Sequence, residues 1–316
     1  MKNKLWPILQ KIFPVIGLLI IVAIFSIICG DKLWTRNNLL NIINIMIPVC
    51  IGGSGMIFVA AQGSTDMSMG ALLAATATLA GMASIRLGLA GFIVVALSTG
   101  LLLGMFNGFI LAKFKVSSLM VTLAMSIMLR AIVSYLTNGQ AIFVNSDILA
   151  LNRPAVKFPV FFITMLVMWL LFKYTKAGFF SRCIGENEVV GKFAGIPVKR
   201  YKIIAFAFSG LMGGVVGMFT VGNVGGVSPT MGNFFELQVM TAMFVGGIPV
   251  LGGAESKFYK LILGSLMLTF LQNGLTLSRV GSEVSELIQG VILLSVVFFG
   301  IFVKAKHYKS ELAKDA

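Results

Sequence analysis

The sequence is poor in the side chains on which most enzyme sites depend. Its one histidine, His307, lies in a polar C-terminal stretch, so a buried histidine base or a histidine metal site is not available. The three cysteines, Cys29, Cys50 and Cys183, form no close pair and no metal-ligand spacing. Only 11% of the residues are charged, and acidic residues number 11 against 25 basic ones. We therefore expect no enzyme of these classes and no cofactor bound by this chain.

Apolar sequence, by contrast, is abundant. Hydrophobic residues make up 58% of the 316 residues, and the mean hydropathy of +0.97 is not that of a soluble domain. A membrane-spanning helix needs about 20 mostly apolar residues. Such segments lie near residues 14–30, 39–61, 65–85, 89–112, 117–137, 159–175, 203–222, 237–251, 259–277 and 284–303. The sequence predicts an all-α integral membrane protein with about ten transmembrane helices in a single domain, residues 1–316.

The basic residues are distributed unevenly between the two sides of these predicted spans. If the N-terminus is cytoplasmic and ten spans alternate, 18 of the 25 basic residues fall on the inside. Cytoplasmic loops of membrane proteins carry this excess, so both termini, the tail 304–316 and the loop 176–202 are predicted to be cytoplasmic. The net charge of +14 is thus explained by topology, and we expect no nucleic-acid partner.

Small residues recur inside the spans at spacings that let helices approach closely. The faces Gly104-x-x-x-Gly108 and Gly210 to Gly217 are the clearest, and tight helix packing explains them. An Asn-Gly pair occurs in the fourth span and again at 273–274 in the ninth. Helices five spans apart run in opposite directions, which is the relation expected of an inverted repeat of spans two to five and seven to ten.

Three polar residues in or beside the spans have two possible roles. Asp66 follows the second span, where it can cap the next helix or line a pathway through the membrane. Asn107 and Asn273 lie within spans, where an amide needs partners, either on a neighbouring helix or along a polar route. Arg130, in the fifth span, must face protein or water.

The longest polar stretch between spans contains glycines and a Gly-Lys pair that superficially suggest a nucleotide-binding loop. Five residues, not four, separate Gly185 from Gly191, and Phe193 stands where the hydroxyl residue belongs. No buried strand is predicted before it. The stretch is therefore not expected to bind a nucleotide itself.

The same stretch predicts a short amphipathic helix. Asn187 can cap its start, Glu188 and Lys192 are spaced as an i, i+4 pair, and Gly195 with Pro197 ends it. Its apolar residues at helical spacing are Val189, Val190, Phe193 and Ile196. Such a face needs a surface, which can be the membrane interface, the underside of the protein or a groove on a cytoplasmic partner.

Several motifs together resemble the permease subunits of bacterial ABC importers for ribose, galactose, xylose and the autoinducer-2 signal. Residues 64–70, STDMSMG, resemble the family's Gly-Ile-Asp-Leu-Ser-Val-Gly signature, with Ser68 among the shared residues. GMFNG and AKFKV at 104–116 resemble its Gly-x-x-Asn-Gly and Ala-Lys-Leu-Lys-Val run. The loop at 185–196 resembles the family's cytoplasmic loop, although its proline and Ala-Ala pair are missing.

The resemblance implies an inverted-repeat permease of the cobalamin-importer type in the bacterial cell membrane, which moves a sugar or sugar-like solute by alternating access. It implies cytoplasmic ATPase subunits that carry ATP and Mg²⁺, a second permease in a homo- or heterodimer, and an extracytoplasmic solute-binding protein, besides membrane lipid. The ATPase-coupling residues would be Gly185, Glu186, Asn187, Glu188, Lys192, Phe193, Gly195 and Ile196. The candidate pathway residues are Asp66, Ser68, Asn107 and Asn273.

A secondary transporter driven by an ion gradient is the alternative. An inverted repeat, interrupted helices and an acid at membrane depth are features of such transporters too. The sequence leaves this alternative open.

Overall fold

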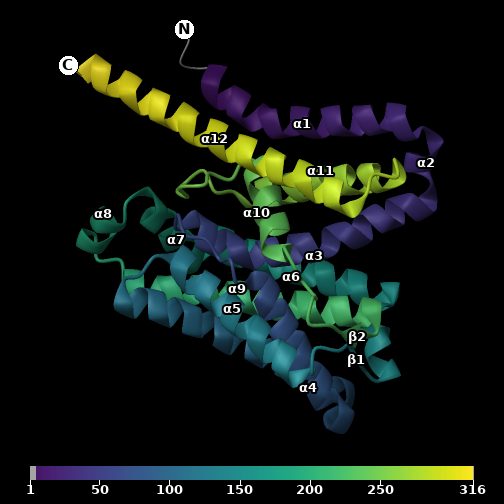
Figure 1. Ribbon diagram of the computed structural model, residues 1–316. Helices are drawn as coiled ribbons and strands as arrows, with labels where there is room; N and C mark the ends of the chain where they lie inside the picture. The colour runs from purple at the N-terminus through teal and green to yellow at the C-terminus, as the bar shows by residue number, and fades with distance from the viewer. Residues whose placement is uncertain (1–4, 316) are drawn as a thin grey trace. The chain divides into compact units, whose positions relative to one another are not determined.

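The computed structural model describes residues 5–315, with side chains from residue 14 to residue 298, and is built almost entirely of helices (Figure 1). In chain order the elements are α1 (Leu5–Cys29), α2 (Asp31–Trp34), α3 (Arg36–Ala61), α4 (Met69–Phe114), α5 (Ser118–Leu136), β1 (Ile142–Phe143), η1 (Ser146–Asn152), α6 (Pro154–Tyr174), α7 (Lys176–Glu186), α8 (Glu188–Phe193), α9 (Val198–Val224), β2 (Gly226–Val227), α10 (Phe235–Val245), α11 (Phe258–Leu277) and α12 (Ser282–Asp315). The predicted all-α class is confirmed. The side chains of the predicted tail 304–316 lie outside the described residues.

Six of the described helices are long and apolar enough to cross a membrane: α3, α4, α5, α6, α9 and α11. Two shorter apolar helical segments are Pro14–Cys29 of α1 and Phe235–Val245, which is α10. The eighth predicted span, 237–251, is thus shorter than predicted, because α10 ends before Gly246 and Gly247. Gly247 has a φ of 91°, which an α-helix does not accommodate.

Helix α4 consists of two helical pieces. Its 46 residues would extend about 69 Å, more than twice the hydrocarbon thickness of a bilayer. Gly88, with φ 61° and ψ −157°, interrupts the helical backbone and lies between the two predicted spans 65–85 and 89–112. The first of these spans was placed too early, however. Residues 62–68 form an irregular turn, and α4 begins only at Met69.

The chain divides into two compact units. Unit 1 contains Met1–Met46, Met240–Val250 and Tyr259–Ala316, and unit 2 contains Ile47–Val239 and Leu251–Phe258. The expectation of a single permease domain over residues 1–316 stays a prediction.

Glycines hold the central helix pair of unit 2 together. A Cβ atom on Gly104 would collide with the carbonyl oxygen of Phe206, and one on Gly210 would collide with that of Gly100. Only the absence of side chains allows α4 and α9 to approach this closely. The close packing predicted from the small-residue faces is confirmed at this helix pair. Beside it, β1 and β2 form a two-residue antiparallel ladder, with Ile142 opposite Val227.

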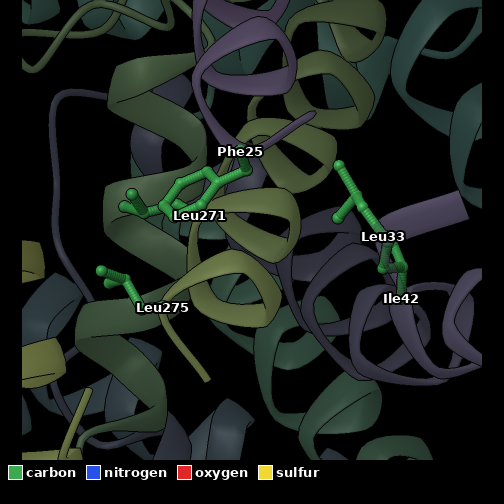
Figure 2. Close-up of a cluster of buried hydrophobic side chains, with 5 residues drawn as sticks. All are labelled: Phe25, Leu33, Ile42, Leu271 and Leu275. Carbon is green, nitrogen blue, oxygen red and sulfur yellow. The ribbon is translucent and has the colours of Figure 1, made fainter. Parts of the chain in front are cut away.

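Unit 1 has its own apolar core. Figure 2 shows the buried side chains that form it: Phe25, Leu33, Ile42, Leu271 and Leu275. They come from α1, α2, α3 and α11. The ring of Phe25 lies over Gly274. A Cβ atom on residue 274 would collide with this ring.

Candidate functional site

The first candidate region is the turn between α3 and α4 in unit 2, where Asp66 is completely buried. One carboxylate oxygen accepts hydrogen bonds from the backbone N–H of Ser68, at 3.0 Å, and from the Ser68 hydroxyl, at 2.6 Å. The other accepts one from the hydroxyl of Ser209 on α9, at 2.7 Å. These hydrogen bonds give both oxygens of the buried carboxyl group a partner, as buried polar groups require. Asp66 therefore fixes the shape of the turn and joins it to α9.

Further contacts join the turn to two more helices. The amide of Asn107 on α4 donates to the Ser68 hydroxyl at 2.8 Å, and its own carbonyl oxygen is buried without a hydrogen-bond partner. On α5, the hydroxyl of Thr122 accepts the backbone N–H of Met67 at 3.0 Å. The turn 62–68 is thus attached by hydrogen bonds to α4, α5 and α9, all within one unit.

Three of the four candidate pathway residues come together in this cluster, and the fourth does not. Asn273 lies on α11 in unit 1, where its amide and that of Asn38 exchange two hydrogen bonds, of 2.8 and 2.9 Å. Asn38 also donates to the carbonyl oxygen of Leu33 at 2.8 Å. The pair connects α11 with α3 inside that unit. Whether any of the four residues contacts a transported solute stays a prediction.

The second candidate region is α8, also in unit 2, and its first end is capped as predicted. The side-chain oxygen of Asn187 accepts the backbone N–H groups of Val189, at 2.9 Å, and Val190, at 3.1 Å. These N–H groups would otherwise lack partners in the first turn of the helix.

The second end is closed by a Schellman motif. Gly195 has a φ of 80°, and its N–H donates to the carbonyl oxygen of Lys192 at 3.0 Å. The N–H of Ile196 reaches back to the carbonyl oxygen of Gly191, also at 3.0 Å. This 6→1 and 5→2 pattern satisfies the last carbonyls and requires a residue that tolerates positive φ. The predicted stop at Gly195 is confirmed.

The apolar face of α8 is left uncovered by the described part of this chain. Phe193 is 89% exposed, and Val189 and Val190 are 59% and 61% exposed. Their helix stands at the end of α7 in Figure 1. A six-residue helix is too short to be stable alone, so α8 must be held by its caps and its neighbours.

Ion pairs provide part of that support. Glu188 contacts Lys192 at 3.1 Å, the predicted i, i+4 pair, and also Lys202 at the start of α9, at 2.7 Å. Partial burial acts to raise the pKa of Glu188, but the two lysines outweigh it and hold the pKa below the ordinary glutamate value. The contact with Lys202 was missed because it is fourteen residues away on another helix.

The residues just before α8 contact other segments of unit 2. Glu186 accepts the backbone N–H of Ala254 at 2.7 Å, so its side chain holds the glycine-rich loop after α10. Gly185 lies against the carbonyl oxygen of Ala61, at the end of α3, with no space for a side chain. Sequence reasoning also missed α7 itself, because residues 176–186 are too polar to be counted as a span.

Arg130 has a structural role in unit 2. Its guanidinium donates to the backbone carbonyl oxygens of Pro229, at 3.2 Å, and Met231, at 2.7 Å. It therefore faces protein backbone, as predicted, and holds the loop between β2 and α10.

Several long apolar helices, a buried polar turn and a capped surface helix define a multi-pass membrane protein. The profile of the family described as "Branched-chain amino acid transport system / permease component" matches residues 38–297. The chain belongs to this family of permease components.

Individual relatives extend over almost the whole chain. It is 32% identical to the ribose import permease protein RbsC of Escherichia coli (strain K12), covering 93% of this chain and 94% of that protein. It is 30% identical to RbsC of Bacillus subtilis (strain 168), covering 92% of each chain. The L-arabinose transport system permease protein AraH of Escherichia coli (strain K12) is 28% identical over 92% of this chain and 91% of its own length. No solved structure matches the chain.

Proposed function

We propose that this chain is the permease subunit of an ATP-driven importer and forms the pathway for a sugar or sugar-like small polar solute by alternating access. The family's description names branched-chain amino acids, whereas the relatives above are named for ribose and arabinose. Since those relatives match nearly the full chain, they support a sugar as the solute.

The observation that carries the ATP-driven part is the exposed face of α8. Both ends of the helix are satisfied by its own caps, so it can be presented as a preformed unit with Val189, Val190 and Phe193 outward. An amphipathic helix that is already ordered fits into an apolar groove at a lower entropic cost than a flexible loop. We assign that groove to a cytoplasmic ATPase subunit, which binds ATP and Mg²⁺, while this chain binds no cofactor.

The coupling residues divide into two groups under this proposal. Glu188, Lys192 and Phe193 lie on the helix that meets the ATPase. Asn187, Gly195 and Ile196 set its ends, and Gly185 with Glu186 anchors it to the permease.

The proposed topology has ten membrane crossings. Two come from α4, on either side of Gly88, and one each from α1, α3, α5, α6, α9, α10, α11 and α12. This topology would make both termini and α8 cytoplasmic, which agrees with the uneven distribution of the basic residues. We propose the inverted-repeat architecture of the cobalamin-importer type. The two Asn-Gly pairs support this proposal because they share two features. In each pair the asparagine amide donates a hydrogen bond to another segment of its unit, and the glycine is closely packed.

Asp66, Ser68, Asn107 and Asn273 are proposed to border the pathway. The partners would be two ATPase subunits, a second permease of the same or another kind, an extracytoplasmic solute-binding protein and the bilayer lipid of the bacterial cell membrane.

The test begins with mild-detergent purification of the tagged chain from its native membrane and identification of its partners by mass spectrometry. A stoichiometric ATPase is expected, together with any second permease. The purified complex, reconstituted in liposomes with its binding protein, should then take up one of D-ribose, L-arabinose or D-fructose, the sugars for which relatives of this chain are named, only when ATP is supplied. A chain that purifies alone, with uptake that survives ATP depletion but stops with an ionophore, would instead establish the gradient-driven transporter.

A further inference from the structure

Gln62 lies where the turn at Asp66 begins, and its side chain makes contacts that the proposed function leaves unexplained. It is 7% exposed and follows the last residue of α3 directly. Its amide nitrogen donates to the hydroxyl of Ser181 on α7, at 3.0 Å, and to the backbone carbonyl oxygen of Tyr201 on α9, at 2.9 Å. One buried side chain thus bridges the two helices on either side of α8.

The two neighbours that Gln62 joins are those that hold α8 in place. Helix α7 ends at Glu186, and Asn187 follows as the cap of α8. On the other side, Lys202 forms its ion pair with Glu188 one residue beyond Tyr201. A displacement of α8 that carries α7 or the start of α9 with it therefore displaces Ser181, Tyr201 or both, the two groups to which Gln62 is attached.

At its other end the same turn enters the buried cluster. Only three residues separate Gln62 from Asp66, which is attached to α9 and, through Ser68, to Asn107 of α4. A second connection runs in parallel. Glu186 holds Ala254, and the neighbouring Gly253 donates its N–H to the carbonyl oxygen of Ala61 at 2.9 Å. Two connections therefore link the end of α3 to α7, one through Gln62 and the other through Glu186.

We infer that Gln62 is a positioning residue that makes the turn 62–68 move together with the α7–α8 pair. The turn is short and is held by buried hydrogen bonds at both ends. Breaking a buried hydrogen bond is costly, so a movement at one end of the turn is transmitted to the other end. The role of this linkage in transport rests on the proposed function. The linkage itself is a property of this chain alone.

The variant that isolates the linkage is Gln62→Met, which keeps the length of the side chain and removes its donors. The matched control is Thr137→Val, which also removes side-chain hydrogen bonding from unit 2, but only to backbone carbonyls of α5. The purified full-length chains are compared by hydrogen–deuterium exchange in lipid nanodiscs, peptide by peptide.

Gln62→Met should speed exchange about fivefold or more in two segments, 62–68 and 176–186, and Thr137→Val in neither. Ser181→Ala should give a smaller change in both segments and add nothing to Gln62→Met, since it removes part of the same linkage. The inference would be overturned if Gln62→Met accelerated exchange only in 62–68 or in neither segment. It would also be overturned if the effects of Gln62→Met and Ser181→Ala on exchange added up in the double variant.

The assembled transporter provides the functional measurement. Gln62→Met should lower ATP-dependent D-ribose, L-arabinose or D-fructose uptake about tenfold while ATP hydrolysis by the complex changes less than about twofold. Equal losses in both would mark an assembly defect and contradict the positioning role. If the wild-type complex shows no ATP-dependent uptake, the proposed function fails, and the exchange experiment still decides the linkage.

Discussion

The turn at Asp66 and helix α8 are both short segments shaped by side-chain hydrogen bonds to backbone N–H groups, but they differ in what covers them. Asp66, Ser68 and Asn107 are wholly buried, and their hydrogen bonds join the turn to α9 and α4 of the same unit. In α8 only the backbone ends are satisfied, while Phe193 and its neighbours have no covering surface in the described structure. The hydrogen bonds of the turn therefore fix the geometry of the protein interior. Those of α8 hold a helix whose apolar face is exposed.

This difference predicts opposite consequences of mutation. Changes in the turn should destabilise the chain whether or not a partner is present. Changes on the face of α8 should leave the isolated chain intact and affect only what binds to it.

The largest effect on stability is expected for Asp66→Ala. It leaves the hydroxyls of Ser68 and Ser209 and one backbone N–H without their acceptor, which should cost about 3 kcal/mol or more. The measurement is the thermal unfolding midpoint of the purified chain in detergent. Ser98→Ala, which removes an exposed hydrogen bond on α4, is the control and should change little.

Asp66→Asn tests the pathway prediction at the same position. If Asp66 acts by holding the turn, uptake and the unfolding midpoint should fall together. Uptake that falls with the midpoint unchanged would instead place the carboxylate in contact with the solute.

Phe193→Asp is the corresponding change on α8. The stability of the isolated chain should change by less than about 0.5 kcal/mol, because the side chain is 89% exposed. Recovery of the ATPase in a pull-down should fall about tenfold or more, since a charge replaces a central aromatic anchor. The control is Phe143→Asp, an aromatic residue of β1 that is 83% exposed. Equal recovery with Phe193→Asp and wild type would remove α8 from the interface.

The caps of α8 are expected to have a smaller effect. Asn187→Ala should weaken the helix by about 1 kcal/mol, and Gly195→Val by about 1–2 kcal/mol, because valine must adopt a φ near 80°. Either change should reduce uptake several-fold with ATP hydrolysis retained. Asn187→Asp keeps the capping acceptor and should behave like wild type. Unchanged uptake in both disrupting variants would contradict the coupling role of α8.

The same comparison shows what the sequence can and cannot predict. The caps of α8, its ion pair with Lys192 and its stop at Gly195 depend on residues at most eight positions apart, and these predictions are confirmed. The small-residue faces of α4 and α9 were also recognised as sites of close packing, but not that these two helices pack against each other.

Contacts between distant segments were not predictable. Ser209 and Gln62 gave no local signal, since a serine in an apolar span and a glutamine after one have no assigned partner until the helices are packed. The turn 62–68 was partly assigned to a helix because the predicted span 65–85 was started four residues before the apolar helix begins at Met69. A single polar cluster, Asp66 with Ser68, was the signal that the backbone there is irregular.

The smallest expected effect concerns Glu188, whose side chain is partly exposed. Glu188→Gln should loosen α8 by about 0.5 kcal/mol at pH 7, measured by hydrogen exchange of its amides. Because the pKa of Glu188 is lower in the folded chain than in the unfolded one, its stabilisation is present above about pH 4.3 and lost as the pH falls through the folded value. Wild type and variant should therefore converge once the pH lies below the pKa of Glu188 in the folded chain. Glu255→Gln, which removes a more exposed pair, is the control. A difference that persists in acid would mean that Glu188 supports α8 by packing and not by charge.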